Sequence, residues 1–149
     1  MKQAFDEKIV LIGAGSAMFT CGVVSDLIRS RQKVDLALVD IDPQALETAA
    51  KLSEKMIQSS QAEIRLTASL DRRAVLPGAT VIITTIGVGG RRAWEQDVFV
   101  PRRFGVNYAV GDTTGPGGTS RARRMIPPML EIARDIAAIQ GVKTSHSVT

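Results

Sequence analysis

The strongest constraint on the fold is a short apolar run that ends at a glycine. Residues 8–13 (KIVLIG) are rich in β-branched side chains, and from residue 16 to residue 30 the apolar residues follow helical spacing. A buried apolar strand of this kind is typical of a parallel sheet. Strand, glycine turn and helix together predict the first strand–helix unit of a Rossmann-like fold.

The turn between this strand and helix is a candidate phosphate site. Gly13 allows a tight turn, and Gly15 lets the backbone approach a pyrophosphate lying on the N-terminus of the helix that begins at Ser16. Met18 stands where the usual fingerprint has a third glycine. We predict Gly13, Gly15 and Ser16 as cofactor-binding residues, and a Rossmann scaffold without cofactor remains the alternative.

The rest of the chain continues the alternation of strands and helices. Further strands are expected at 34–40, 63–69 and 79–87, helices at 43–60 and 120–140, and a short candidate strand at 142–148. Pro127 and Pro128 should bend the last helix or start it afresh. Apolar strands alternating with helices predict an α/β, doubly wound parallel sheet.

Asp40 ends the second predicted strand, where a carboxylate can accept hydrogen bonds from the hydroxyls of an adenosine ribose. The same charge would repel a 2′-phosphate, which favours NAD over NADP. Asp42 precedes Pro43 and is expected to cap the following helix rather than bind ligand.

Composition narrows the class of protein. The 149 residues fit one domain, 1–149, and aromatic residues make up only 4 %, which argues against stacking platforms for nucleic acid. One cysteine excludes a disulfide framework and fits a reducing compartment. Neither a signal peptide nor a membrane-length apolar run is visible, so we expect a cytoplasmic protein without nucleic-acid or membrane partners.

Three further motifs carry a resemblance to a known family. They are TTIGVGG (84–90), GDTTGPGG (111–118) and IPPMLEIARD (126–135), and they follow KIVLIGAGS and LVDIDPQALE in the same order along the chain. From about residue 8 to residue 140 the sequence resembles glycoside hydrolase family 4, the NAD-dependent glycosidases.

The resemblance implies a fold, a cofactor and a chemistry. Family members oxidise the sugar at C3 with NAD, lose the C2 proton to a base, eliminate the glycosidic oxygen, add water and return the hydride, with manganese or another divalent metal at the sugar oxygens. Thr85 and Gly89 would then lie at the cofactor. Asp112 matches the acidic position at the sugar, and Arg91 and Arg92 are the arginines expected to meet a small-molecule glycoside.

The resemblance also suggests a class of sugar. In the phosphosugar members an arginine precedes V-G-G, where this chain has Gly87. The G-D-T-T form of the loop is similar to the α-galactosidase and uronidase-like branch. We therefore expect an unphosphorylated α-galactoside or uronide, and we expect most of the other arginines between the fourth strand and the last helix to be solvated.

The C-terminal end departs from the family pattern. Residues 141–149 resemble a later family segment, with Ser145 at the position of the metal-binding cysteine, which indicates a rearranged or truncated terminus. His146 is the only histidine and is expected at the surface. The resemblance thus implies a Rossmann-like domain truncated before the family's C-terminal substrate and metal domain, without metal ligands or catalytic base of its own.

Two other interpretations stay open at this point. The chain could be a stand-alone NAD-binding module, or a fragment of an oxidoreductase related to lactate and malate dehydrogenases. In each case a truncated sheet would leave an exposed edge, so we expect a homo-oligomer.

Overall fold

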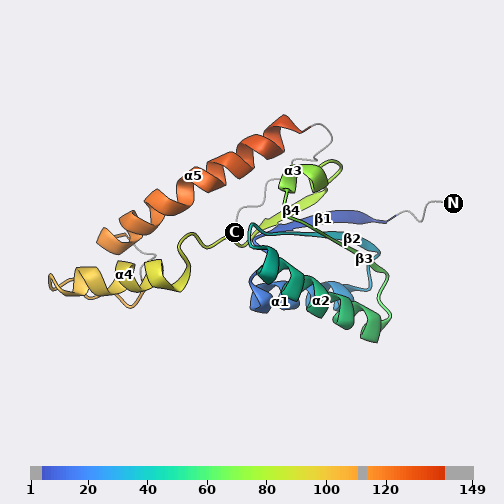
Figure 1. Ribbon diagram of the computed structural model, residues 1–149, viewed down its shortest axis with the longest axis horizontal. Coiled ribbons are helices and arrows are strands. Elements are labelled where there is room, and N and C mark those ends of the chain that lie inside the picture. The colour runs from blue at the N-terminus through green and yellow to red at the C-terminus, as the bar shows by residue number, and fades with distance from the viewer. Residues whose placement is uncertain (1–4, 111–113, 140–149) are drawn as a thin grey trace. The chain divides into compact units, whose positions relative to one another are not determined.

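The computed structural model describes residues 5–110 and 114–139, and the chain forms two compact units (Figure 1). Of the described residues, 5–86 and 136–139 belong to the sheet unit, and those between 87 and 135 belong to the helical unit. Within the described residues, no helix is long and apolar enough to span a membrane.

The sheet unit is built on a four-stranded parallel sheet with the strand order β3-β2-β1-β4. β1 and β2 therefore lie in the middle of the sheet. The connection from β3 to β4 crosses both of them to reach the opposite edge. The strands are β1 (Glu7–Ile12), β2 (Val34–Val39), β3 (Ile64–Ser69) and β4 (Val81–Thr84). The parallel α/β sheet predicted from the sequence is confirmed.

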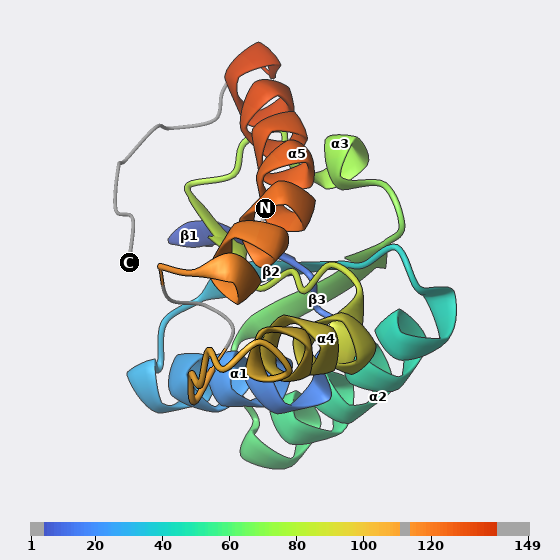
Figure 2. The same ribbon diagram turned by 90° about the vertical axis from the view of Figure 1, so that its left-hand side faces the viewer.

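Two helices cover one face of this sheet. The helices α1 (Ala17–Ser30) and α2 (Pro43–Ser60) lie side by side on that face, and the one-turn helix α3 (Arg72–Val75) lies on the opposite side (Figures 1 and 2). All six residues of β2 are buried. Leu11, Leu36 and Leu38 are fully buried and belong to the hydrophobic core, together with Val24 of α1.

Local sequence accounts for the start of α2. The Asp42 side chain accepts hydrogen bonds from the backbone N–H groups of Gln44 and Ala45, at 2.9 and 3.2 Å, and Pro43 occupies the first turn. Both features stabilise a helix N-terminus. The capping role predicted for Asp42 is confirmed.

The helical unit contains the helix α4 (Gly90–Arg102) and most of the helix α5 (Pro116–Ala138). The sequence analysis did not predict α4, which begins at Gly90 and contains Pro101 in its last turn. The helix expected at 120–140 begins earlier, at Pro116, and it continues through Pro127 and Pro128 rather than starting afresh. The strand expected at 79–87 is shorter, and the strand expected at 142–148 lies outside the described residues.

We expect Gly13→Ala to destabilise the sheet unit strongly in the absence of ligand. Gly13 has a φ of +95°, and a Cβ there would lie 2.8 Å from the carbonyl carbon of Thr85. Positive φ and a backbone clash together should lower the free energy of unfolding by about 2 kcal/mol or more. Thermal or urea unfolding followed by circular dichroism measures the change.

Gly22→Ala is the matched control. Gly22 lies inside α1, and a Cβ there would meet nothing within 4 Å. Alanine should raise the stability by up to about 1 kcal/mol, because glycine is a poor helix former. Equal melting temperatures for the two variants would contradict the constraint at Gly13.

Candidate functional site

The turn between β1 and α1 is held from both sides by the neighbouring strands. The carbonyl oxygen of Val39, at the end of β2, accepts hydrogen bonds from the N–H groups of Gly13 and Ala14, at 2.8 and 3.0 Å. On the other side Thr85 follows β4, and its hydroxyl donates to the carbonyl oxygen of Gly13 at 3.0 Å. The turn is therefore fixed by the strands that the sheet order makes adjacent to β1.

The N-terminus of α1 is open. Ser16 occupies the N-cap position, its side chain makes no capping hydrogen bond, and the first turn carries no acidic residue. The first N–H groups of a helix have no partners within the helix, and the helix dipole adds partial positive charge there. Ala17 and Met18 are exposed beside these groups. This end of α1 can accept an anion.

Met18 does not need to be a glycine in this structure. Its side chain is 85 % exposed, so no strand packs against that position. Two residues on, Thr20 is fully buried, and its hydroxyl donates to the carbonyl oxygen of Ala14 at 2.7 Å. In the usual fingerprint the third glycine allows the helix to lie close to the strand and turn. In this structure the helix contacts the turn at Thr20, through its hydrogen bond to Ala14.

Asp40 lies against the same turn. Its Oδ2 accepts a hydrogen bond from the N–H of Gly15 at 2.7 Å, and its Oδ1 accepts one from the N–H of Asp42 at 2.9 Å. A Cβ at Gly15 would lie 2.7 Å from Oδ2, so the carboxylate requires a glycine there. Each oxygen of a carboxylate has a second lone pair, which leaves Asp40 able to accept bonds from a diol.

These residues form an arrangement that fits a dinucleotide. A helix N-terminus without a cap suits a pyrophosphate, and a carboxylate fixed beside it suits ribose hydroxyls. The structure thus brings Gly13, Gly15, Ser16, Asp40 and Thr85 together at the carboxyl ends of β1, β2 and β4. In open α/β sheets this edge is where ligands bind.

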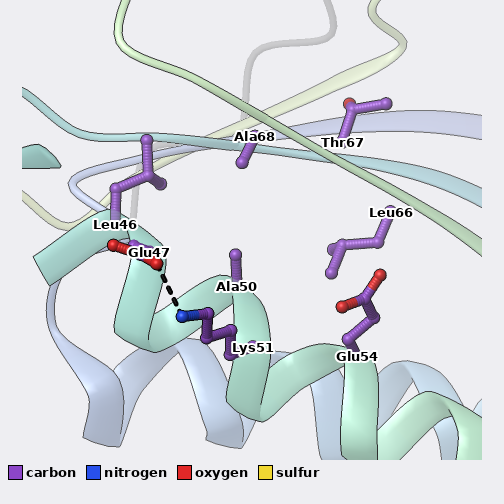
Figure 3. Close-up of a pocket in the computed structure, with 8 residues that line it drawn as sticks. All are labelled: Leu46, Glu47, Ala50, Lys51, Glu54, Leu66, Thr67 and Ala68. Carbon is purple, nitrogen blue, oxygen red and sulfur yellow. Dashed lines mark hydrogen bonds and ion pairs between the residues drawn. The ribbon is translucent and has the colours of Figure 1, made fainter. Parts of the chain in front are cut away.

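A groove of about 350 Å³ lies elsewhere in the sheet unit, between α2 and β3 (Figure 3). Leu46, Ala50 and Leu66 give it an apolar lining. On its rim Lys51 and Glu47 form an exposed ion pair at 2.6 Å, one helical turn apart. None of the predicted site residues lines this groove.

The remaining predicted residues belong to the helical unit or lie outside the described residues. Gly89 is the N-cap of α4, with a φ of +82°. Arg91 and Arg92 follow it and are exposed, and the Nε of Arg91 donates to Glu95 at 2.9 Å. Asp112, Ser145 and His146 lie outside the described residues. In the described part of the chain, no group of three or more His, Cys, Asp or Glu side chains is placed to hold a metal ion.

The helical unit contains a charged pair that the sequence analysis missed. Asp97 of α4 is buried, with its side chain 1 % exposed, and Arg124 of α5 donates to both of its oxygens, at 2.9 and 2.5 Å. The hydrogen bonds from Arg124 hold the pKa of Asp97 below its usual value, although desolvation acts in the opposite direction. Arg124 is thus an exception among arginines that were expected to be mostly solvated. Asp97 lies next to Val98 and one turn before Pro101, the other two buried residues of α4, which was the available signal.

Comparison with known proteins places this geometry in a family. The model of the family 4 glycosyl hydrolases matches residues 8–140. The chain is 38 % identical over 135 residues to an alpha-glucosidase of Erwinia rhapontici, covering 89 % of this chain and 30 % of that protein. It is 34 % identical over 134 residues to an alpha-galactosidase of Rhizobium meliloti, covering 89 % and 27 %. Other relatives include alpha-galacturonidases.

A solved structure shows the same fold. The 6-phospho-beta glucosidase of Thermotoga maritima, determined with manganese, NAD+ and glucose-6-phosphate, superposes with a TM-score of 0.80 at 22 % identity. The match covers 91 % of this chain and 32 % of that one. NAD and manganese, expected from the resemblance for full-length members of the family, are both present in that relative.

The chain spans about 30 % of the length of the relatives that it matches. The matched part contains the four-stranded sheet, the turn at Gly13 and Gly15, and both helices of the helical unit. This chain belongs to family 4 of the glycosyl hydrolases.

Proposed function

We propose that residues 1–149 form the NAD-binding domain of a family 4 glycosidase that acts on O-glycosyl compounds. The observation that carries the proposal is the open N-terminus of α1 beside the carboxylate of Asp40, which accepts a bond from Gly15 at 2.7 Å. A stand-alone NAD-binding module would use the same residues. The family match favours a glycosidase over the lactate- and malate-dehydrogenase-like alternative.

Each residue of the sheet unit has a separate role in this proposal. The N–H groups at the start of α1, after Gly15 and Ser16, bind the pyrophosphate. Asp40 accepts bonds from the adenosine ribose, and Gly13 and Thr85 keep the turn in place. Bound NAD would accept a hydride from the sugar and later return it, in the oxidation, elimination, addition and reduction sequence of the family. A divalent metal, manganese or another, would bind outside the described residues.

We propose an unphosphorylated α-galactoside or uronide as the sugar. The relatives named alpha-galactosidase and alpha-galacturonidase support this choice, as does the absence of an arginine at Gly87. Arg92 and Asp112 are the candidates for sugar contact, together with Arg91. Arg91 donates to Glu95 through Nε, which leaves the two terminal nitrogens as the pair that a uronate carboxylate would bind.

We expect NAD to raise the melting temperature of the chain more than NADP does. The negative charge of Asp40 would repel the 2′-phosphate of NADP, whereas the Asp40 carboxylate can accept hydrogen bonds from the ribose hydroxyls of NAD. A ligand at 100 times its Kd stabilises by about 2.7 kcal/mol, so a tenfold difference in Kd is measurable by differential scanning fluorimetry. Asp40→Ala should reduce the difference between the melting-temperature shifts that NAD and NADP cause.

Asp42→Ala is the control for this experiment. It removes the cap of α2 and should lower the melting temperature by the equivalent of about 1 kcal/mol, with the preference for NAD unchanged. Equal shifts by NAD and NADP in the unmodified chain would contradict the role of Asp40.

We expect the chain to self-associate through β4. Among the described residues, β4 pairs with β1 on one side only, and Val81 is 39 % exposed. An apolar edge strand is a template for pairing with a second copy. Light scattering at increasing concentration should show dimers or larger species, and Val81→Lys should shift the population toward monomer. A compact monomer at every concentration would overturn this expectation.

We expect the 149-residue chain to show no hydrolysis of aryl α-galactosides or glucuronides, even with NAD, manganese and reductant. The described residues offer no metal cluster and no assigned base, and each such group typically contributes a factor of about 10²–10⁴ to the rate. Release of the aryl group, followed by absorbance, is the measurement. Cleavage that depends on NAD and manganese, and that is lost in Asp112→Ala, would mean that this chain completes the site.

A further inference from the structure

Ala14, in the turn between β1 and α1, has both of its backbone polar groups fixed. Its N–H donates to the carbonyl oxygen of Val39 in β2 at 3.0 Å, and its carbonyl oxygen accepts the hydroxyl of Thr20 in α1 at 2.7 Å. Ala14 and Thr20 are both fully buried. The turn is therefore tied to the sheet through Val39 and to the helix through Thr20.

Thr20 also closes the first turn of α1 with its backbone. Its N–H donates to the carbonyl oxygen of Ser16, the N-cap residue, at 2.9 Å. One residue thus bonds to the start of the helix through its N–H and to the preceding turn through its hydroxyl. Between the two bonded positions lie residues 17–19, whose N–H groups have no partners within the helix. The two bonds of Thr20 determine where those N–H groups lie relative to the turn.

The hydrogen bond of the Thr20 hydroxyl differs from the usual one of a serine or threonine inside a helix. Such hydroxyls commonly bond to the carbonyl oxygen four residues back. Ser53 does so in α2, where its hydroxyl donates to Ala49 at 2.7 Å. The Thr20 hydroxyl instead reaches the carbonyl oxygen six residues back, outside its own helix. Bonding within α1 therefore does not account for a buried hydroxyl at this position.

Packing does not require the hydroxyl either. Valine has nearly the shape of threonine and would fill the same buried space, but it would remove the donor from the carbonyl oxygen of Ala14. A buried carbonyl without a partner is costly, so the turn and the start of α1 would shift until that oxygen found another donor. The N–H groups of residues 17–19 would move with the start of the helix.

We propose that Thr20 is a positioning residue, whose hydroxyl sets the turn against the N-terminus of α1 and thereby the geometry in which residues 17–19 bind the pyrophosphate. The proposal rests on the function proposed above, and it concerns the sheet unit alone. Because Thr20 is 0 % exposed, it acts through the backbone and not by contact with a ligand. Hydrogen bonds from N–H groups to a phosphate weaken when they lengthen or bend, so a small shift should lower the affinity.

The test measures binding of ADP to the 149-residue chain by isothermal titration calorimetry. ADP carries the pyrophosphate and the adenosine ribose of NAD. In Thr20→Val we expect the affinity for ADP to fall by about tenfold, and in Thr20→Ser, which keeps the hydroxyl, by less than about threefold. If Thr20 acted only by filling space, the order would be reversed, because valine keeps the volume of the side chain and serine does not.

Ser53→Ala is the matched control. It removes a buried hydroxyl bond of the same 2.7 Å length from the middle of α2, in the same unit. The affinity for ADP should change by less than about twofold in this variant, even where the melting temperature falls. Equal losses of ADP affinity in Thr20→Val and Ser53→Ala would indicate a general loss of stability and would overturn the proposal.

Hydrogen exchange at single residues, followed by NMR without ligand, gives a second measurement. The N–H of Ala14 bonds to Val39, and the N–H of Gly15 bonds to Asp40 at 2.7 Å. In Thr20→Val we expect both N–H groups to exchange faster relative to those of β2, because the turn is no longer held by α1. Thr20→Ser and Ser53→Ala should leave these relative rates unchanged.

The outcomes separate a positioning role from a structural one. Unchanged ADP affinity in Thr20→Val, a larger loss in Thr20→Ser than in Thr20→Val, or unchanged relative exchange at Ala14 and Gly15 would each contradict the proposal. If the unmodified chain bound neither NAD nor ADP, the proposed function would fail. The exchange measurement would still decide whether Thr20 holds the turn against α1.

Discussion

The candidate site depends on the single carbonyl oxygen of Val39, which accepts the N–H groups of both Gly13 and Ala14. These bonds draw the first turn toward β2 directly after β1 ends, and they require the positive φ of Gly13. With the turn fixed there, Asp40, the residue after Val39, is brought to hydrogen-bonding distance of Gly15. The end of β2 therefore sets both the path of the turn and the place of the carboxylate.

Gly13 and Gly15 are each required in the turn, but for different physical reasons. Gly13 is needed because its backbone adopts a φ of +95° against the chain at Thr85. Gly15 is needed because the carboxylate of Asp40 occupies the space that a side chain would fill. The sequence analysis attributed Gly15 to the approach of a pyrophosphate alone. The contact with Asp40 shows a constraint that exists without any ligand.

Features determined by neighbouring residues were predictable from the sequence. The cap at Asp42 acts on N–H groups two and three residues away, and β1 and β4 contain continuous apolar runs, so local patterns sufficed for these elements. The ion pair between Asp97 and Arg124 joins two helices across a loop, and no local pattern pairs these residues. The helix α4 was missed for a related reason, because the burial of Asp97 depends on α5 and makes the inner stripe of α4 look polar in the sequence.

Asp40 and Asp97 show why one carboxylate is a ligand candidate and the other is not. The oxygens of Asp40 each accept one backbone N–H, from Gly15 and from Asp42. The carboxylate therefore retains lone pairs and negative charge at the sheet edge, where hydroxyl donors can use both. Asp97 is buried, and a guanidinium takes both of its oxygens. Removing Arg124 from it would leave an uncompensated buried charge, so Asp97 is not a candidate for binding a ligand.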